Sequence, residues 1–244
     1  MKRTLALLIL VSCAASSAHA VLNPFSGFSQ NATSSALKPF ALDLGGLLGA
    51  STVDTGRTYG FPGFWVGGDV VAQSRPDSND VILRNSNVHA FALPMIQAGV
   101  GLPFDTDVVL HGVGAYGVTV FGGGVRKSLY RTGTITTFLP NVSVSAFGDK
   151  VNAGPFSASH GAVNANAMWN LPILKPFVEA GYDLTKVTVG SSPVPGLAGT
   201  TATANGTRLA VGLDITPLPF FDLRLAAMEL HGITGGQLGL GFTF

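Results

Sequence analysis

The hydrophobic and polar positions of the last residues of the chain alternate strictly. From residue 237 onward, Gln, Gly and Thr occupy the odd-numbered positions, whereas the even-numbered positions are apolar. The apolar set is Leu238, Leu240, Phe242 and Phe244. A period of two indicates a β-strand, because successive side chains of a strand point to opposite sides. The pattern therefore predicts a terminal strand with one apolar face.

The segments before it have the same period and carry their charges on the opposite face. Apolar side chains fill the odd positions of 209–215 and the even positions of 178–184. In a barrel wall, a charge facing lipid costs about 2 to 4 kcal/mol at mid-depth, so we expect the polar face to line a lumen. The expected polar lumen residues are His160, Glu179, Asp183, Arg208, Asp214, Asp222, Arg224, Glu229 and His231.

The alternation changes phase once, in the penultimate strand. After the inward charge at Arg224, Met228 and Leu230 form the next apolar, lipid-facing pair. We expect a β-bulge near Ala226–Ala227, since a bulge inserts one residue and turns the following side chains over. The alternative, with Glu229 facing lipid, is disfavoured by the cost of placing a charge there.

Ten segments in all fit a strand, and an even number is typical of bacterial single-chain barrels with both ends in the periplasm. The first seven are 58–74, 87–101, 105–114, 117–130, 138–148, 156–170 and 174–189, and three more follow up to Phe244. The external loops are then 75–86, 115–116, 149–155, 190–204 and 232–236, and the periplasmic connections are 102–104, 131–137, 171–174 and 217–220. The fold class predicted is an all-β, antiparallel transmembrane barrel.

The register of one hairpin follows from the same pattern. A three-residue connection at 218–220 sets Leu213 opposite Leu225 and Asp214 opposite Arg224. A slip of one residue would turn every side chain to the wrong face. We therefore expect an ion pair between Asp214 and Arg224 in the lumen.

Composition agrees with a membrane location. Charged residues make up 11% of the chain and hydrophobic residues 46%, whereas an ordinary soluble protein is about 25% charged. After residue 20 no run of about 20 apolar residues is present, so the sequence predicts no transmembrane helix. A closed barrel is the other structure that satisfies every backbone hydrogen bond in lipid.

The N-terminus has the pattern of a secretory signal over residues 1–20. Lys2 and Arg3 precede an apolar run, and small residues end at Ala20, where we expect cleavage. The alternative is a lipoprotein signal cut before Cys13. Cys13 is the chain's one cysteine, so no disulfide is expected in the mature protein.

A short helix is expected between the signal and the barrel. Apolar residues follow helical spacing from Leu37, Pro39 suits a first turn, and Gly49 suits a C-cap, which predicts a helix over about 39–48. This helix would plug the lumen or cap the periplasmic mouth; a loosely packed leader is the alternative. The organisation expected is a signal at 1–20, an N-terminal segment at 21–57 and a barrel at 58–244.

Two features resemble known families. The terminal pattern ending at Phe244 is similar to the last strand of outer-membrane barrels, which implies that Leu238, Leu240, Phe242 and Phe244 are read by the barrel-assembly machinery. The layout of a helix, then Gly60 to Phe64, then strands with Gly122 to Lys127 in the fourth, resembles uncharacterised Gram-negative outer-membrane barrel families. That resemblance implies a location in the outer membrane of the cell envelope, with outer-membrane lipid as the partner, and it identifies no ligand.

Candidate chemistry is sparse. The histidines of the mature chain lack metal-ligand spacing, so we expect no metal and no cofactor. His160 or His231 could join Glu179 or Glu229 in a Ser-His-acid site, but no motif places a serine beside them, so we expect no enzyme. Without Lys2 and Arg3 the chain has 12 basic and 13 acidic residues, and no basic block suggests nucleic acid.

Three functions remain after these exclusions. A small porin-like channel or passive carrier of small solutes is favoured narrowly. A non-conducting structural or surface-interaction barrel is the alternative, since barrels of about eight strands are just filled by side chains. A lipid-modifying barrel enzyme is the third.

Overall fold

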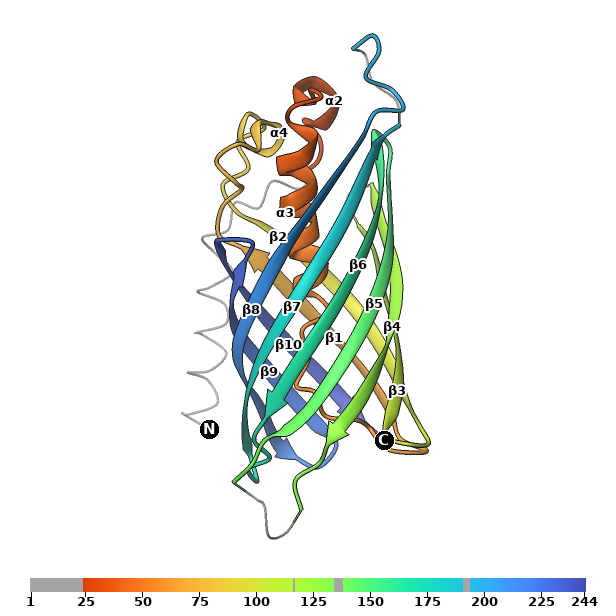
Figure 1. Ribbon diagram of the computed structural model, residues 1–244, viewed down its shortest axis with the longest axis vertical. Coiled ribbons are helices and arrows are strands. Elements are labelled where there is room, and N and C mark those ends of the chain that lie inside the picture. Colours follow the sequence, from red (N-terminus) through yellow and green to blue (C-terminus); the bar gives the residue numbers. More distant parts are fainter. Residues whose placement is uncertain (1–23, 116, 134–137, 191–193) are drawn as a thin grey trace, which may run out of the picture.

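Ten antiparallel strands form a closed barrel, as predicted, in which each strand pairs with its neighbours in sequence and β10 pairs with β1 (Figure 1). The computed structural model describes residues 24–115, 117–133, 138–190 and 194–244. The strands are β1 (Phe64–Gln73), β2 (Phe91–Leu102), β3 (Thr106–Ala115), β4 (Val118–Tyr130), β5 (Asn141–Ala153), β6 (Phe156–Met168), β7 (Leu174–Val189), β8 (Thr201–Leu218), β9 (Phe221–Leu230) and β10 (Ile233–Thr243). The signal-peptide prediction lies outside the described residues.

The barrel closes at one end, where Phe64 and Phe244 exchange backbone hydrogen bonds of 3.0 and 2.8 Å. We call this end the lower rim, as drawn in Figure 1, and the opposite end the upper rim. The upper rim carries the connection 74–90 and the described part of 190–200, and the lower rim carries 103–105, the described part of 131–140, 169–173 and 219–220. The first strand, β1, therefore begins at the lower rim, and the last strand, β10, ends there.

The outward face of the strands is apolar over most of the barrel height. Leu238, Leu240 and Phe242 are 51%, 50% and 40% exposed, whereas Gln237, on the inner face of the same strand, is buried. Other strands repeat this alternation, as expected. We call the exposed set the apolar belt: Val66, Val70, Ile96, Leu110, Phe121, Val125, Val144, Val163, Val178, Leu184, Leu209, Val211, Leu213, Leu225, Leu238, Leu240 and Phe242.

The prediction of a bulge near Ala226–Ala227 is wrong. β9 pairs with β8 in one unbroken register from Leu230 to Leu223, and the irregularity lies between Ile215 and Leu218. Met228 and Leu230 face inward like the charges before them, because the upper half of the lumen is apolar. Glu229 consequently lies on the exposed outer face, at the upper rim.

Two of the predicted external loops are also wrong. β5 continues to Ala153, so 149–155 shrinks to a tight turn, and β10 begins at Ile233, which removes the loop 232–236. Gly235 and Gly236 lie within the predicted loop, yet both pair with β1 and β9. At Gly235 the Leu230 side chain and a β1 carbonyl approach too closely for a Cβ, which explains glycine within a strand.

The N-terminal segment occupies the lumen. It comprises α2 (Phe28–Asn31), then α3 (Leu37–Ala50), longer than the predicted 39–48 and ending at the C-cap Ser51 rather than before Gly49. Most residues of α3 are buried, since the helix lies inside the upper half of the barrel (Figure 1). A further short helix, α4 (Val81–Arg84), sits in the first upper loop. The structure therefore places α3 as a plug, not as a cap at the lower rim.

From Ser51 the chain descends through the lumen to the lower rim, where β1 starts. We call residues 51–59 the thread. The first described residues, near Pro24, lie at the upper rim, opposite Phe244. Among the described residues, no helix has the length and apolarity needed to cross a bilayer.

Aromatic rings seal the upper end of the lumen. Phe28, Phe40 and Phe156 lie with ring centroids 4.7 to 5.1 Å apart, and Phe25 joins them at 5.5 Å from Phe156. Edge-to-face pairs of this kind add to the stabilisation from apolar burial. The cluster ties the N-terminal helices to the inner face of β6.

Candidate functional site

The lumen and the thread that fills it form the candidate site. An extended thread has backbone N–H and C=O groups that need partners when buried. Side chains from β2, β3, β4, β6, β7, β8, β9 and β10 supply hydrogen bonds to it. Those wall residues are Gln97, Asp107, Arg126, Asn164, Asn166, Glu179, Arg208, Arg224 and Gln237.

Individual hydrogen bonds show that wall side chains bind the backbone of the thread. The Val53 carbonyl accepts from Arg224 at 3.2 Å and from Gln237 at 3.4 Å. The Ser51 carbonyl accepts from Gln97 at 3.0 Å. The Asp54 N–H donates to Glu179 at 3.1 Å. The polar wall therefore replaces the strand partner that an extended segment lacks.

Asp54 is the centre of the lower lumen. Its carboxylate pairs with Arg126 of β4 and, at 3.1 Å, with Arg224 of β9. Arg126 also lies 3.6 Å from Asp107 and stacks over the ring of Tyr59, 5.1 Å from its centroid. Removing one partner of a buried ion pair is strongly destabilising. One carboxylate of the thread thus holds two arginines from separate parts of the wall.

A second ionic cluster lies higher, where α3 meets β7 and β8. Nη1 of Arg208 lies 2.7 Å from both carboxylate oxygens of Asp183, and Nη2 donates to Asn164 at 2.6 Å. His231 bonds Asp183 at 3.0 Å. A Cβ at Gly49 would overlap the Arg208 and Asp183 side chains, so glycine lets the helix approach the pair.

A row of imidazoles and carboxylates crosses the inner wall beside this cluster. His111, Gly122, Asp149 and His160 are successive register partners on β3 to β6. Asp149 bonds His111 across the space left by Gly122, and His160 at 2.6 Å. His160 and His231 thus bond aspartates, not the Glu179 or Glu229 that a Ser-His-acid site was to use. No group of three His, Cys, Asp or Glu in the described residues can hold a metal ion.

At the upper rim, Asp43 of α3 fastens the first upper loop. Its carboxylate accepts from Gln73 at 2.7 Å and from the Asp77 N–H at 2.8 Å. Asp80 is buried close by and caps α4 through the Leu83 N–H at 3.0 Å. Burial raises the pKa of Asp43 to about 8 and also raises the pKa of Asp80. We call this group the loop latch.

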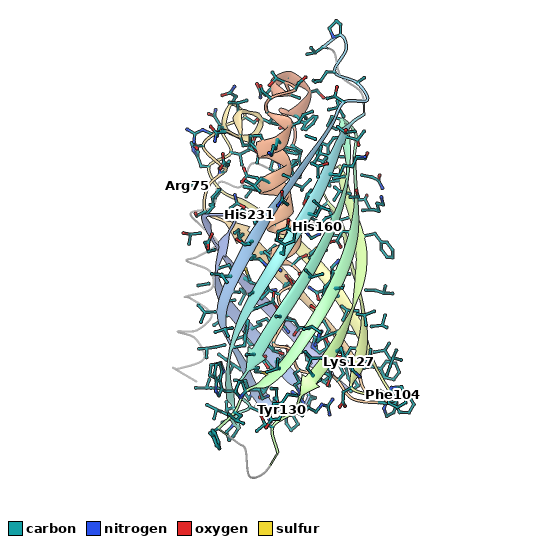
Figure 2. All side chains as sticks on the ribbon, in the orientation of Figure 1. Arg75, Phe104, Lys127, Tyr130, His160 and His231 are labelled. Carbon is teal, nitrogen blue, oxygen red and sulfur yellow. The ribbon has the colours of Figure 1, made fainter. Side chains whose placement is uncertain are left out.

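The structure places eight of the nine predicted polar residues at the lumen. Figure 2 shows His160 and His231 beside α3 in the upper half, well away from Lys127 and Tyr130 at the lower rim. The buried members are His160, Glu179, Asp183, Arg208, Asp214, Asp222 and Arg224, and His231 is half-buried in the last upper turn. The prediction for Glu229 is wrong: it is exposed on the outside, where it accepts a bond from the Gly232 N–H.

Sequence reasoning missed Asp54, Asp107, Arg126 and Asp149. Arg126 was recoverable, because its neighbour Val125 faces outward and the period of two turns residue 126 to the lumen. Asp54 had no such signal, since the thread is irregular and has no period.

The wall itself carries an excess of acid. Among the described strand residues, the buried acidic ones are Asp69, Asp107, Asp149, Glu179, Asp183, Asp214 and Asp222, and the buried basic ones are Arg126, Lys175, Arg208 and Arg224. Seven acids against four bases leave the wall anionic before the histidines are counted.

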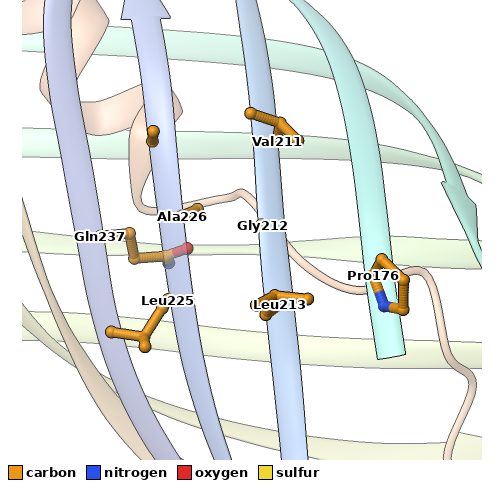
Figure 3. Close-up of a pocket in the computed structure, with 8 residues that line it drawn as sticks. Pro176, Val211, Gly212, Leu213, Leu225, Ala226 and Gln237 are labelled. Carbon is orange, nitrogen blue, oxygen red and sulfur yellow. The ribbon is translucent and has the colours of Figure 1, made fainter. Parts of the chain in front are cut away.

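The outer wall has a shallow apolar hollow of about 490 Å³ (Figure 3). Its exposed members Val211, Leu213 and Leu225 belong to the apolar belt, and small residues such as Gly212 and Ala226 form its base. A lipid acyl chain fits such a surface, so we assign the hollow to the belt.

No protein-family model and no curated protein matches the chain. It is similar to solved barrels: the N-terminal β-barrel domain of OprF from Pseudomonas aeruginosa, at 13% identity over 75% of this chain and 97% of that one, with a TM-score of 0.38. Ail, the attachment invasion locus protein of Yersinia pestis, gives 13% identity, coverages of 75% and 100%, and a TM-score of 0.35. The KdgM porin gives 7% identity over 74% of this chain and 99% of that one, with a TM-score of 0.38.

At these identities and TM-scores the similarity carries no conclusion of its own; the barrel fold rests on the strand pairing. The fold and the apolar belt are those of an outer-membrane β-barrel.

Proposed function

We propose that the protein is an outer-membrane barrel closed by its own N-terminal segment. The barrel would act through its outer face and upper loops rather than as an open pore. The observation that carries this proposal is the thread, which hydrogen-bonds to side chains of eight strands. This proposal differs from the channel that the sequence narrowly favoured, because a plug held by the wall on so many sides obstructs the lumen.

A hollow of about 280 Å³ opens at the lower rim, beside Arg57, Tyr59 and Asn141, but the packing around Asp54 above it supports closure. The hollow beside Asp54, which Arg57 and Trp65 help to line, has a volume of about 20 Å³. A water molecule needs about 10 to 15 Å³ on this measure, so the hollow has room for about one. Moving the thread away would break the ion pairs of Arg126 and Arg224 with their shared carboxylate, Asp54.

The orientation follows from the connections and the belt. Barrels of this class have short periplasmic turns and longer external loops. The long connection 74–90, together with 190–200, favours an external upper rim, whereas 131–140 at the lower rim is the one long connection that does not fit this pattern; Phe244 at the lower rim would then lie in the periplasm. The alternating terminal strand would be the segment that the barrel-assembly machinery reads.

Planar-bilayer recording tests the proposal. We expect the complete protein to be silent at high protein density, and a variant lacking residues 24–58 to show discrete openings, because only the second has a free lumen. The variant must first run as a folded, heat-modifiable barrel. Openings of the complete protein equal to those of the deletion variant would contradict closure.

A gated pore is the second candidate, favoured by the anionic wall. With the thread displaced, seven buried acids against four bases would attract cations. If voltage opens the complete protein, the reversal potential in a KCl gradient should show preference for K⁺. We propose no catalytic role, because both ring nitrogens of His160 and of His231 lie against carboxylates or a backbone carbonyl inside the packed lumen, which leaves neither nitrogen for a nucleophile.

A further inference from the structure

A polar hollow interrupts the outer face of β5, β6 and β7 near the upper rim. It has a volume of about 300 Å³ and is lined by Lys150, Val151, Asn152, Ser157, Ala158, Ser159, Lys186 and Thr188. Lys150, Ser159 and Lys186 are register partners in one row across the three strands. Asn152, Ser157 and Thr188 form the next row above. We call these six polar residues the basic hollow.

The geometry of the row suits one anionic group. Neighbouring strands lie about 4.7 to 4.9 Å apart, so the two lysines flank the serine at about 10 Å from each other. Ser159 is small, which leaves space between the two long lysine stems. The two lysines on either side of Ser159, with serine and threonine hydroxyls in the row above, present donors of the kind that bind phosphate oxygens.

Neither lysine is used elsewhere in the described part of the chain. Lys150 and Lys186 are exposed, and no carboxylate lies within ion-pair distance of either. By contrast, Lys175 is buried and donates to Thr216 at 2.6 Å, and Lys127 donates to the Phe104 carbonyl. The two lysines of the hollow therefore form a positive patch without a counter-charge.

The height of the hollow points to a lipid headgroup. The outward residues one and two steps below it include Val163 on β6, and Leu184 and Tyr182 on β7, which are 56%, 51% and 45% exposed. Tyr182 bonds Asn205 through its hydroxyl, as a tyrosine does at a membrane interface. The lysines thus lie where the apolar belt ends and the headgroups begin.

We propose that the basic hollow binds the phosphate headgroup of an anionic lipid in the leaflet at the upper rim. The lipid's chains would run down the belt on β6 and β7 while its phosphate lies between Lys150 and Lys186. The identification of this leaflet as the outer one rests on the orientation proposed above. The binding itself does not, so it can fail while the closed lumen stands.

Native mass spectrometry of the detergent-solubilised protein with diphosphorylated lipid A tests the site. Each lysine near a charged surface contributes about a fivefold gain in affinity, so Lys150→Ser and Lys186→Ser should each weaken binding about fivefold and the double variant about 25-fold. Lys38→Ser, which removes an exposed lysine on α3, is the matched control and should bind as the wild type does. The double Lys→Arg variant keeps both charges and should retain binding.

Two further arms separate the sources of phosphate. Dephosphorylated lipid A should bind no better to the wild type than to the double Ser variant, and inorganic phosphate at equal concentration should not displace the lipid. Equal binding of lipid A by the wild type and by a folded double Ser variant would overturn the proposal. Full displacement by inorganic phosphate would also overturn it, since the hollow would then be a general anion site.

Discussion

Asp214 and Arg224 stand opposite each other across the β8–β9 hairpin, yet Arg224 gives its guanidinium to Asp54 of the thread, 3.1 Å away. The register predicted from alternation is confirmed, including Leu213 opposite Leu225. The ion pair predicted from that register is wrong, because the described residues show no salt bridge between Asp214 and Arg224. The Arg224 side chain is long enough to reach the thread, where it pairs with Asp54, the carboxylate that also pairs with Arg126.

The choice of partner by Arg224 can be measured by double-mutant cycles on the free energy of unfolding. Coupling within a shared ion-pair network is about 0.5 to 3 kcal/mol. We expect the cycle of Asp54→Ala with Arg224→Ala to give at least about 1 kcal/mol, and the cycle of Asp214→Ala with Arg224→Ala less than about 0.5 kcal/mol. A larger coupling to Asp214 would show that the arginine belongs to the hairpin and not to the thread.

Replacing Gly49 by alanine should destabilise the protein, although alanine favours a helix by about 1 kcal/mol over glycine. A Cβ at this position overlaps Arg208 and Asp183, so we expect a loss of roughly 1 to 3 kcal/mol, as for overpacked cores. In the control Gly46→Ala, the new Cβ would lie 3.3 Å from the end of the Gln73 side chain, which can move. Equal effects of the two substitutions on thermal unfolding would refute close docking at Gly49.

The loop latch should open as the pH rises. The pKa of Asp43 is raised by burial from 3.8 to about 8, so its protonated form favours the closed latch. That stabilisation is complete below about pH 4 and is lost as the pH rises through about 8. Spin labels at Lys38→Cys and Ser78→Cys should therefore report a longer or broader distance at pH 9 than at pH 6.

Asn at position 43 cannot ionise, so Asp43→Asn should remove most of this pH response. The Asp80 carboxylate lies close to Asp43 and its pKa is also raised by burial, which leaves a smaller residual change. A pH response that is identical in the Asn variant would assign the titration to other groups.

The orientation of the barrel can be read from cysteine labelling on whole cells. Single cysteines at Ala198, in the connection 190–200, and at Ser26, before α2, should react with an impermeant maleimide. A cysteine at Pro172, in the lower connection 169–173, should react after permeabilisation only. The reverse pattern would invert the assignment of the rims.

Alternation predicted the strands of the C-terminal half because the face of each strand toward lipid needs apolar side chains, whereas the face toward the lumen carries polar ones. It failed at Met228 and Glu229, where the lumen is apolar because α3 fills it, so that an inward methionine looked like an outward one. The helix was found from its spacing, but its place was open, since a plug and a cap show the same apolar pattern.

The contacts inside the lumen could not be predicted from the sequence, for a different reason. Asp54 lies in an extended thread without a period, and its partners Arg126 and Arg224 come from strands far apart in the chain. Only the closure of the barrel brings these three groups together.

Cross-linking the thread to the wall in native outer membranes tests the closed lumen most directly. Thr52 Oγ1 lies 3.1 Å from Asn164 Nδ2, so Thr52→Cys with Asn164→Cys puts two thiols on facing side chains of the thread and the wall. The account predicts a disulfide-linked peptide pair after mild oxidation, found by mass spectrometry, and none for Thr52→Cys with Val163→Cys, whose second cysteine faces lipid. Free thiols at positions 52 and 164 in the folded, membrane-inserted protein would contradict it, because the thread would then lie outside the lumen.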